Sequence, residues 1–240
     1  MTSHEISPGL VIQGFVPPLK LSDFKLAAFD MDSTLINIEC VDEIADAAGR
    51  KQEVAAITEA AMRGEITDYK DSLRRRVALL AGVPVSAMEE VYEKRLQLNP
   101  GAEILTAALR EVGCKLLLVS GGFTFFTDRI RDKLSMDFAR SNVLEIASGK
   151  LTGRMVDQVW GDICDGEEKR KMLLQTCSDL GISPKQAMAV GDGANDLPMM
   201  LACSEAGGLS VAFHAKPKVR SQAMVAINDG GLHRVLTLLA

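Results

Sequence analysis

Aspartates at two points of the chain form patterns that could carry out chemistry on a phosphate. Asp30 and Asp32 stand two residues apart in FDMDSTL, and Asp192 and Asp196 belong to VGDGANDLPM. A carboxylate such as Asp30 is ionised at neutral pH and can act as a nucleophile, while a second carboxylate two residues further on transfers protons. Carboxylates brought close together repel one another, so they favour a hard cation between them. Where a phosphate shares the site, that cation is usually Mg²⁺.

A serine followed by two glycines offers a second kind of chemistry, in LLLVSGGF. Ser120 carries a hydroxyl, and the amides of Gly121 and Gly122 can approach a phosphate oxygen closely at the start of a helix. Taken alone, each of the three motifs is also compatible with a turn or a helix cap. Asn195 and Asp196, for example, are good capping residues.

Each motif follows a short apolar run that is typical of a buried strand. These runs cover 25–30, 115–120 and 187–192, further strand-like runs cover 209–213 and 223–228, a hairpin is expected over 143–157, and helical patterns cover 101–112, 123–134, 166–180 and 231–239. The alternation predicts a doubly wound, mostly parallel, Rossmann-like α/β sheet. Ligands of such sheets bind beyond the carboxyl ends of the strands, so the three motifs are expected to converge on one crevice.

The interval 38–98 differs from the rest because it contains no strand-like run. Its amphipathic patterns, rich in Ala, Glu, Arg and Met, predict several helices. A connection of this length is far longer than one crossover helix requires. We therefore expect a helical cap domain at 38–98, inserted into an α/β core made of 22–37 and 99–240. Residues 1–21 are interpreted as an N-terminal extension.

Composition excludes several classes of partner. The balance of 27 basic and 32 acidic residues gives a formal net charge of −5, which disfavours nucleic acid as the main ligand. No apolar run approaches the ~18 residues of a membrane span. The N-terminus lacks a signal-peptide pattern and the five cysteines form no C-x-x-C motif, so we expect a cytoplasmic protein with reduced thiols. The oligomeric state is left open.

The combination of FDMDSTL, LVSGGF, EEKRKMLL and VGDGANDLPM resembles the haloacid dehalogenase-like hydrolases, and the similarity runs from residue 22 to the end of the chain. The stretch DMDSTLINIECVDEIADAAG is similar to the members that act on O-phosphoserine. The resemblance implies Mg²⁺-dependent hydrolysis of O-phosphoserine to serine and phosphate through an aspartyl-phosphate, the last step of serine biosynthesis. The alternative is a phosphatase or phosphotransferase acting on another small phosphomonoester. A signalling receiver domain, the rival from another class, would lack both the second carboxylate and the cap.

The resemblance also implies roles for individual residues. Asp30 would be the nucleophile, and Asp32 would act as acid and then as base. The phosphoryl group would be held by Ser120, Gly121, Lys169 and Asn195. Mg²⁺ would be bound by Asp30, by the backbone carbonyl of Asp32 and by Asp192, with Asp196 in support.

Substrate choice would depend on the cap. Glu39 matches the family residue that pairs with the substrate ammonium, and Arg76 matches the one that binds the carboxylate, for which a guanidinium is well suited. Met62 and Tyr69 would supply apolar walls, with Tyr69 standing where the family pattern has Phe.

One departure from the family pattern affects the carboxylate-binding residue. Between Met62 and Arg76 this chain is one residue longer than the pattern, in GEITDYKDSLRRRV. Arg74 and Arg75 therefore remain alternatives to Arg76, whose assignment rests on the following Val77.

Overall fold

The computed structural model describes residues 3–62 and 65–240, without the side chains of 61 and 62. Its described strands form a single sheet in the order β1-β2-β9-β8-β7-β3-β4-β5-β6. The strands are β1 (Ser3–Ser7), β2 (Leu10–Gln13), β3 (Leu26–Phe29), β4 (Lys115–Phe123), β5 (Phe138–Ala147), β6 (Lys150–Val156), β7 (Ala187–Gly191), β8 (Leu209–Phe213) and β9 (Val225–Ile227).

The middle of the sheet is parallel and its two edges are antiparallel. Strand β3 pairs in parallel with β4 on one side and β7 on the other, and β5, β8 and β9 continue the parallel pairing. At one edge β6 returns antiparallel to β5, and at the other the β1–β2 hairpin pairs antiparallel with β9. The N-terminal extension predicted at 1–21 therefore extends the sheet.

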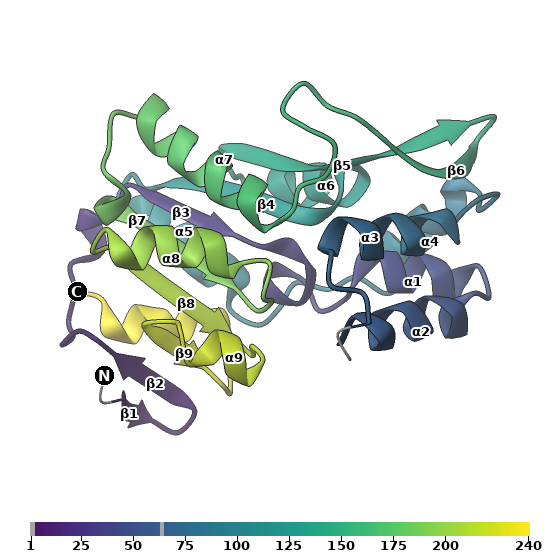
Figure 1. Ribbon diagram of the computed structural model, residues 1–240. Helices are drawn as coiled ribbons and strands as arrows, with labels where there is room; N and C mark the ends of the chain where they lie inside the picture. Colours follow the sequence, from purple (N-terminus) through teal and green to yellow (C-terminus); the bar gives the residue numbers. More distant parts are fainter. Residues whose placement is uncertain (1–2, 63–64) are drawn as a thin grey trace.

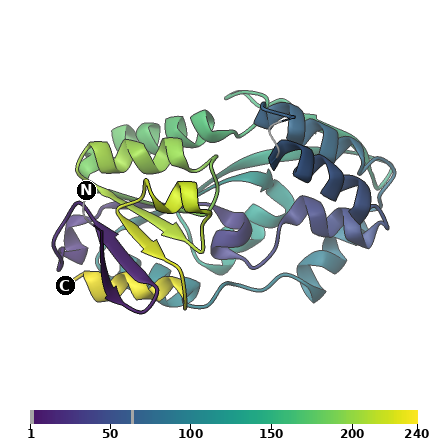
Figure 2. The same cartoon turned by 60° about the horizontal axis from the view of Figure 1, so that its bottom comes forward.

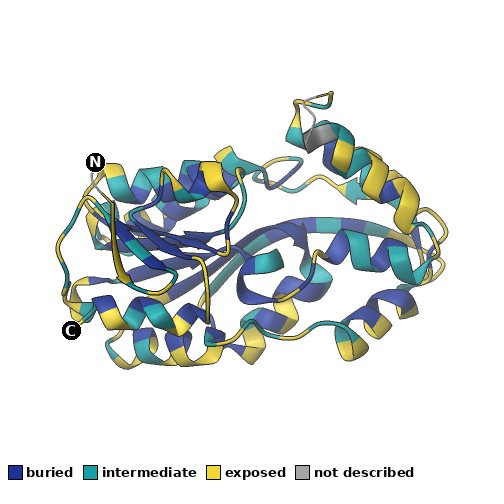
Figure 3. Ribbon diagram, turned by 90° about the horizontal axis from the view of Figure 1, so that it is seen from below, coloured by how far each residue is buried: buried dark blue, intermediate teal, exposed yellow. Residues whose placement is uncertain are grey.

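Helices cover both faces of the sheet, and every residue of its central strand β3 is therefore buried. Leu26 and Ala28 pack into one apolar layer, together with residues of α7 (Gly166–Asp179) and α8 (Leu197–Glu205). Ala27 and Phe29 pack into the other layer, with residues of α5 (Ala102–Glu111) and α6 (Thr124–Lys133). Figures 1 and 2 show the sheet between these layers, and Figure 3 shows the strands as its buried centre. The predicted doubly wound, mostly parallel α/β fold is confirmed.

Of the described α-helices between β3 and β4 in the sequence, α5 packs against the sheet, and the four that precede it lie at one end of the molecule (Figure 1). They are α1 (Cys40–Ala47), α2 (Lys51–Met62), α3 (Tyr69–Ala78) and α4 (Val85–Lys94). Arg95, just after α4, pairs with Glu43 and Asp46 of α1 at 2.9 and 2.6 Å and so ties the first and last of these helices together. The helical character predicted for this interval is confirmed.

The β5–β6 hairpin reaches from the sheet to these helices. The Gly82 amide donates to the Leu151 carbonyl at 2.8 Å, and the Leu151 amide donates to the Val83 carbonyl at the same distance. The predicted hairpin at 143–157 is present, but β5 begins earlier, at Phe138. The predicted C-terminal helix is instead a 3-10 helix, Leu232–Leu238.

Two further observations bear on the predicted class of protein. All five cysteines are buried and unpaired, as the sequence predicts. Within 3–62 and 65–240, no helix combines the length and the apolar character that crossing a bilayer requires.

Candidate active site

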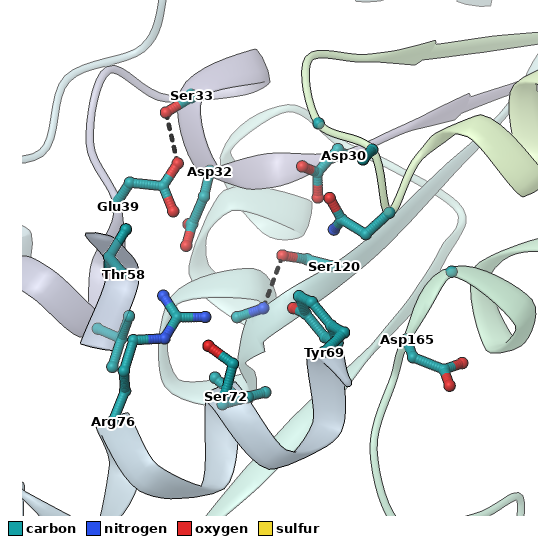
Figure 4. A pocket seen from close by; sticks show the side chains of 18 of the residues that line it. Asp30, Asp32, Ser33, Glu39, Thr58, Tyr69, Ser72, Arg76, Ser120 and Asp165 are labelled. Atoms are coloured by element: carbon teal, nitrogen blue, oxygen red, sulfur yellow. Dashed lines mark hydrogen bonds between the residues drawn. The ribbon is translucent and has the colours of Figure 1, made fainter. Parts of the chain in front are cut away.

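The three motifs meet where β3, β4 and β7 end. They face a cavity of about 760 Å³ between the sheet and the four-helix insert (Figure 4). Of the residues singled out from the sequence, those that line it are Asp30, Asp32, Glu39, Tyr69, Arg76, Ser120, Gly121, Gly122, Asp192 and Asn195. Lys169 and Asp196 are completely buried. The side chain of Met62 lies outside the described residues.

The turn after β3 holds the two aspartates in place. The Asp30 amide donates to the Val190 carbonyl of β7 at 3.0 Å. Ser33 then adopts a positive φ of 55°, which turns the chain sharply. Asn99 donates from its side chain to the carbonyls of Thr34 and Ile36 at 2.8 and 2.9 Å and so anchors this turn from outside the motif.

Lys169 is the buried centre of charge behind the cavity. Its Nζ lies 2.6 Å from Oδ1 of Asp30 and 2.6 Å from Oδ1 of Asp196. The other oxygen of Asp196 accepts the amides of Asp192 and Gly193 at 3.1 and 2.9 Å. Asp196 thereby fixes both the lysine and the loop that carries Asp192.

Negative charge nevertheless remains in excess in this part of the site. Carboxylate oxygens of Asp30, Asp192 and Asp196 all lie within 4.8 Å of one another. Burial and the charge of Asp196 raise the pKa of Asp30 to about 7. Burial and the charges of Asp30 and Asp196 raise the pKa of Asp192 to about 8. A group of oxygen ligands that resists ionisation in this way is suited to a hard divalent cation.

Asp32 sits in a different environment from Asp30. Its Oδ2 accepts the amide of Cys40 at 3.1 Å, whereas its buried Oδ1 has no hydrogen-bond partner among the residues described. Burial, followed by the charges of Glu39 and Asp30, raises the pKa of Asp32 well above its ordinary value. A carboxyl group that keeps its proton at neutral pH can serve as a general acid.

The SGG motif forms a tight lining with no space for side chains. Ser120 Oγ accepts the Gly122 amide at 2.9 Å. A Cβ atom at Gly121 would come within 1.9 Å of the Tyr69 hydroxyl oxygen. The buried Asn142 donates to the Gly121 carbonyl at 2.8 Å and accepts the Cys164 amide at 2.8 Å, which fixes the orientation of the Gly121 peptide.

Sequence reasoning missed two supporting residues, Asn99 and Asn142. Both act through backbone carbonyls that are distant in sequence, 65 residues away for Thr34 and 21 for Gly121. Neither belongs to a motif. The only signal available was an amide residue beside an apolar run, which is too common to single them out.

The insert contributes polar groups on the opposite side of the cavity. Glu39 accepts the Ser33 hydroxyl at 2.6 Å. The Arg76 side chain enters the cavity beside Thr58 and Ser72 (Figure 4). Its buried Nε has no hydrogen-bond partner among the residues described. A cation and an anion therefore face the Asp30 cluster across the cavity.

The structure separates the three consecutive arginines of α3. Arg75 pairs with the exposed Asp71 at 2.9 Å on the same helix. Arg74 pairs with Asp162, outside the lining of the cavity. Arg76 is the one that lines it.

Asp162 also connects the insert to the loop that precedes α7. It accepts a hydrogen bond from Lys70 at 2.7 Å as well as one from Arg74, and both cations belong to α3. Lys70 also lies 3.6 Å from Asp165, the N-cap of α7. We call this group of four side chains the α3 ion-pair cluster. It holds α3 beside the segment that leads to Lys169.

With this geometry established, comparison with known proteins identifies the family. Residues 24–203 match the family described as haloacid dehalogenase-like hydrolase. The chain belongs to this family.

Two relatives in this family and one solved structure carry the same name, phosphoserine phosphatase. A phosphoserine phosphatase of Polaromonas sp. strain JS666 is 74% identical over 239 residues, covering 100% of both chains. One of Haemophilus influenzae is 44% identical over 238 residues, covering 99% of this chain and 72% of its own. A solved structure of a phospho-aspartyl intermediate analogue of phosphoserine phosphatase has a TM-score of 0.80 and 37% identity, covering 90% of this chain and 99% of that one.

Proposed function

We propose that this protein hydrolyses O-phosphoserine to serine and inorganic phosphate. One observation carries the proposal: Glu39 and Arg76 face the Asp30, Ser120 and Asp192 cluster across a single cavity. Phosphoserine carries an ammonium, a carboxylate and a phosphate. The cavity offers an anion, a cation whose Nε has no partner among the described residues, and a phosphate-handling motif to match them. The identity of 74% to a named phosphoserine phosphatase supports the same substrate.

The donor set fits Mg²⁺. Carboxylate oxygens of Asp30 and Asp192 and the backbone carbonyl of Asp32 would hold the ion, with Asp196 positioning the loop of Asp192. The raised pKa values of Asp30 and Asp192 reflect an excess of negative charge, which a divalent cation would offset. When bound, Mg²⁺ supplies positive charge that lets an anionic nucleophile approach an anionic phosphate.

Asp30 would act as the nucleophile, and Asp32 would transfer the protons. A carboxylate oxygen of Asp30 attacks phosphorus, the bond between phosphorus and the seryl oxygen breaks, and protonated Asp32 gives its proton to that oxygen. Asp32 then removes a proton from the water that attacks the phosphorus of the aspartyl-phosphate. Phosphate leaves, and Asp30 is regenerated as a carboxylate. The environments of the two residues suit these roles, because Lys169 pairs with Asp30 whereas one buried oxygen of Asp32 has no partner in the described part of the chain.

The remaining groups position the substrate. Ser120, the Gly121 amide and Asn195 line the cavity beside Asp30 and would hold phosphoryl oxygens, and Lys169 would add positive charge from behind. We interpret 38–98 as the cap of a core formed by 22–37 and 99–240, with the α3 ion-pair cluster joining the two. All five thiols are free, which is compatible with the cytoplasm, where we place the reaction.

A substrate panel tests the proposal. Steady-state rates with Mg²⁺ would be compared for phosphoserine, phosphothreonine, phosphoethanolamine and a sugar phosphate. We expect kcat/KM for phosphoserine to exceed that for phosphoethanolamine, which lacks the carboxylate, by about 100-fold, the upper range for one buried charged hydrogen-bonded contact. Equal values, or a preference for the sugar phosphate, would contradict the assignment.

A further inference from the structure

The hydroxyl of Tyr69 occupies an unusual place in the cavity. Tyr69 is the first residue of α3, and its ring reaches from the insert toward the SGG motif of the sheet, beside Ser120 (Figure 4). A Cβ atom at Gly121 would lie 1.9 Å from the hydroxyl oxygen and 3.1 Å from the ring carbon that bears it. The hydroxyl therefore rests directly on the backbone of Gly121, in space that any side chain at 121 would fill.

The Tyr69 hydroxyl is a donor without an acceptor among the residues that the structure describes. Tyr69 lines the cavity, and its hydroxyl makes no hydrogen bond to any residue within 3–62 and 65–240. Burial raises the pKa of the Tyr69 hydroxyl well above its ordinary value, so it keeps its proton throughout the neutral range. A protonated phenol that lines a cavity can donate one hydrogen bond to a ligand that enters it.

The charges around the hydroxyl identify the kind of acceptor. The hydroxyl rests on Gly121 beside Ser120, and the charges of Lys169, Arg76 and Asp30 all affect its pKa. Lys169, Asp30, Ser120 and Gly121 are the groups that the proposed reaction places around the phosphoryl group. An acceptor in this position is therefore an oxygen of that group, rather than the amino-acid part of the substrate, which Glu39 and Arg76 would bind.

We propose that the Tyr69 hydroxyl donates a hydrogen bond to a phosphoryl oxygen of the substrate and so completes the phosphate subsite from the insert. The inference rests on the proposed function, and it adds a polar contact to the apolar wall predicted for this residue. Because the hydroxyl belongs to α3 and the rest of the subsite to the sheet, phosphate bound here connects the two parts of the molecule.

A calorimetric titration of the Mg²⁺-loaded protein with inorganic phosphate tests this hydrogen bond directly. Tyr69→Phe removes the hydroxyl and keeps the ring. We expect its Kd for phosphate to rise about tenfold or more, the usual effect of losing a hydrogen bond to a charged group. Tyr92→Phe is the matched control, since Tyr92 of α4 is the other tyrosine of the chain and lies outside the cavity. We expect no change there.

Turnover separates this inference from the proposed function. For Tyr69→Phe, we expect kcat/KM to fall by the same factor on phosphoserine and on phosphoethanolamine, because the hydroxyl contacts the group that they share. A phosphate Kd within twofold of wild type, or a loss confined to phosphoserine, would overturn the inference. Wild-type protein that binds phosphate but hydrolyses no phosphoserine would instead remove the proposed function, and the phosphate titration would still test Tyr69.

Discussion

The side-chain nitrogen of Lys169 lies 2.6 Å from Oδ1 of Asp30, although the two residues are 139 positions apart in the sequence, and no part of the lysine is exposed. The same nitrogen contacts Asp196 at 2.6 Å. This buried cation is what allows two carboxylates to be placed side by side behind the cavity.

Replacement of Lys169 should therefore affect both stability and activity. Lys169→Met leaves Asp30 and Asp196 buried without their cation. Breaking a buried ion pair in this way costs about 3–5 kcal/mol in the free energy of unfolding. Denaturant unfolding of the metal-free protein measures this loss in the free energy of unfolding. Lys171→Met, at an exposed position of the same helix, is the control and should be neutral. Equal unfolding free energies for the two variants would contradict this account of the site.

The pH dependence of stability follows from the raised pKa values of Asp30, to about 7, and Asp192, to about 8. In the unfolded chain both groups titrate near pH 4, so between about pH 4 and pH 8 the folded, metal-free protein binds more protons than the unfolded chain does. Its stability must then fall as the pH rises through this window.

Thermal unfolding of the metal-free protein at about pH 6, 7 and 8.5 measures the slope. Asp192→Asn removes one of the two carboxyl groups and should make the dependence of Tm on pH less steep. Added Mg²⁺ should raise the Tm most at the highest pH, where both carboxylates are ionised. A Tm that rises with pH in the metal-free wild type would show that the carboxylates are not held as the structure has them.

Loss of the α3 ion-pair cluster should change the KM for phosphoserine more than it changes the stability of the fold. Asp162 accepts from Lys70 and Arg74, and all three side chains are partly exposed, so each pair contributes only about 0.2–1 kcal/mol. We expect Asp162→Asn to raise KM about two- to fivefold and to leave the Tm within a few degrees. Asp71→Asn breaks the exposed pair with Arg75 and should leave KM unchanged. A shared effect of both variants would show that general charge, rather than this cluster, is responsible.

The three arginines of α3 should differ sharply in their effect on specificity. Arg76→Ala removes the cation that lines the cavity, and we expect kcat/KM for phosphoserine to fall about 100-fold, within the range for a buried charged contact. Arg75→Ala should change it less than twofold. With phosphoethanolamine, which has no carboxylate, the fall in kcat/KM caused by Arg76→Ala should be far smaller. A large loss in Arg75→Ala would mean that the carboxylate is bound one residue earlier.

The parts of the fold that the sequence predicted are those with strong local patterns. The runs at 25–30, 115–120 and 187–192 are nearly continuous in apolar residues because both faces of these strands are covered. Their polar ends meet because parallel strands finish at one edge of a sheet. Lys169 was found only through the order of motifs, since EEKRK alone describes an ordinary charged helix.

The parts that were missed depend on contacts between distant segments. Strand β2 has only four residues, and its pairing with β9 joins positions more than 200 residues apart. Asn99 and Asn142 act on carbonyls of other segments and leave no local pattern. The choice among three consecutive arginines also needed the structure, because successive residues of a helix point about 100° apart and only the position of the cavity selects one of them.

Phosphate release from O-phosphoserine, measured for wild type and Asp30→Asn with Mg²⁺ and with a chelator, tests the central claim most directly. We predict release by the wild type with Mg²⁺, its loss on chelation and its return when Mg²⁺ is restored. For Asp30→Asn, we predict a rate at least about 10⁴-fold lower, because the nucleophile is absent, with an unchanged circular dichroism spectrum. Full activity in Asp30→Asn, or no release by the wild type, would contradict the account.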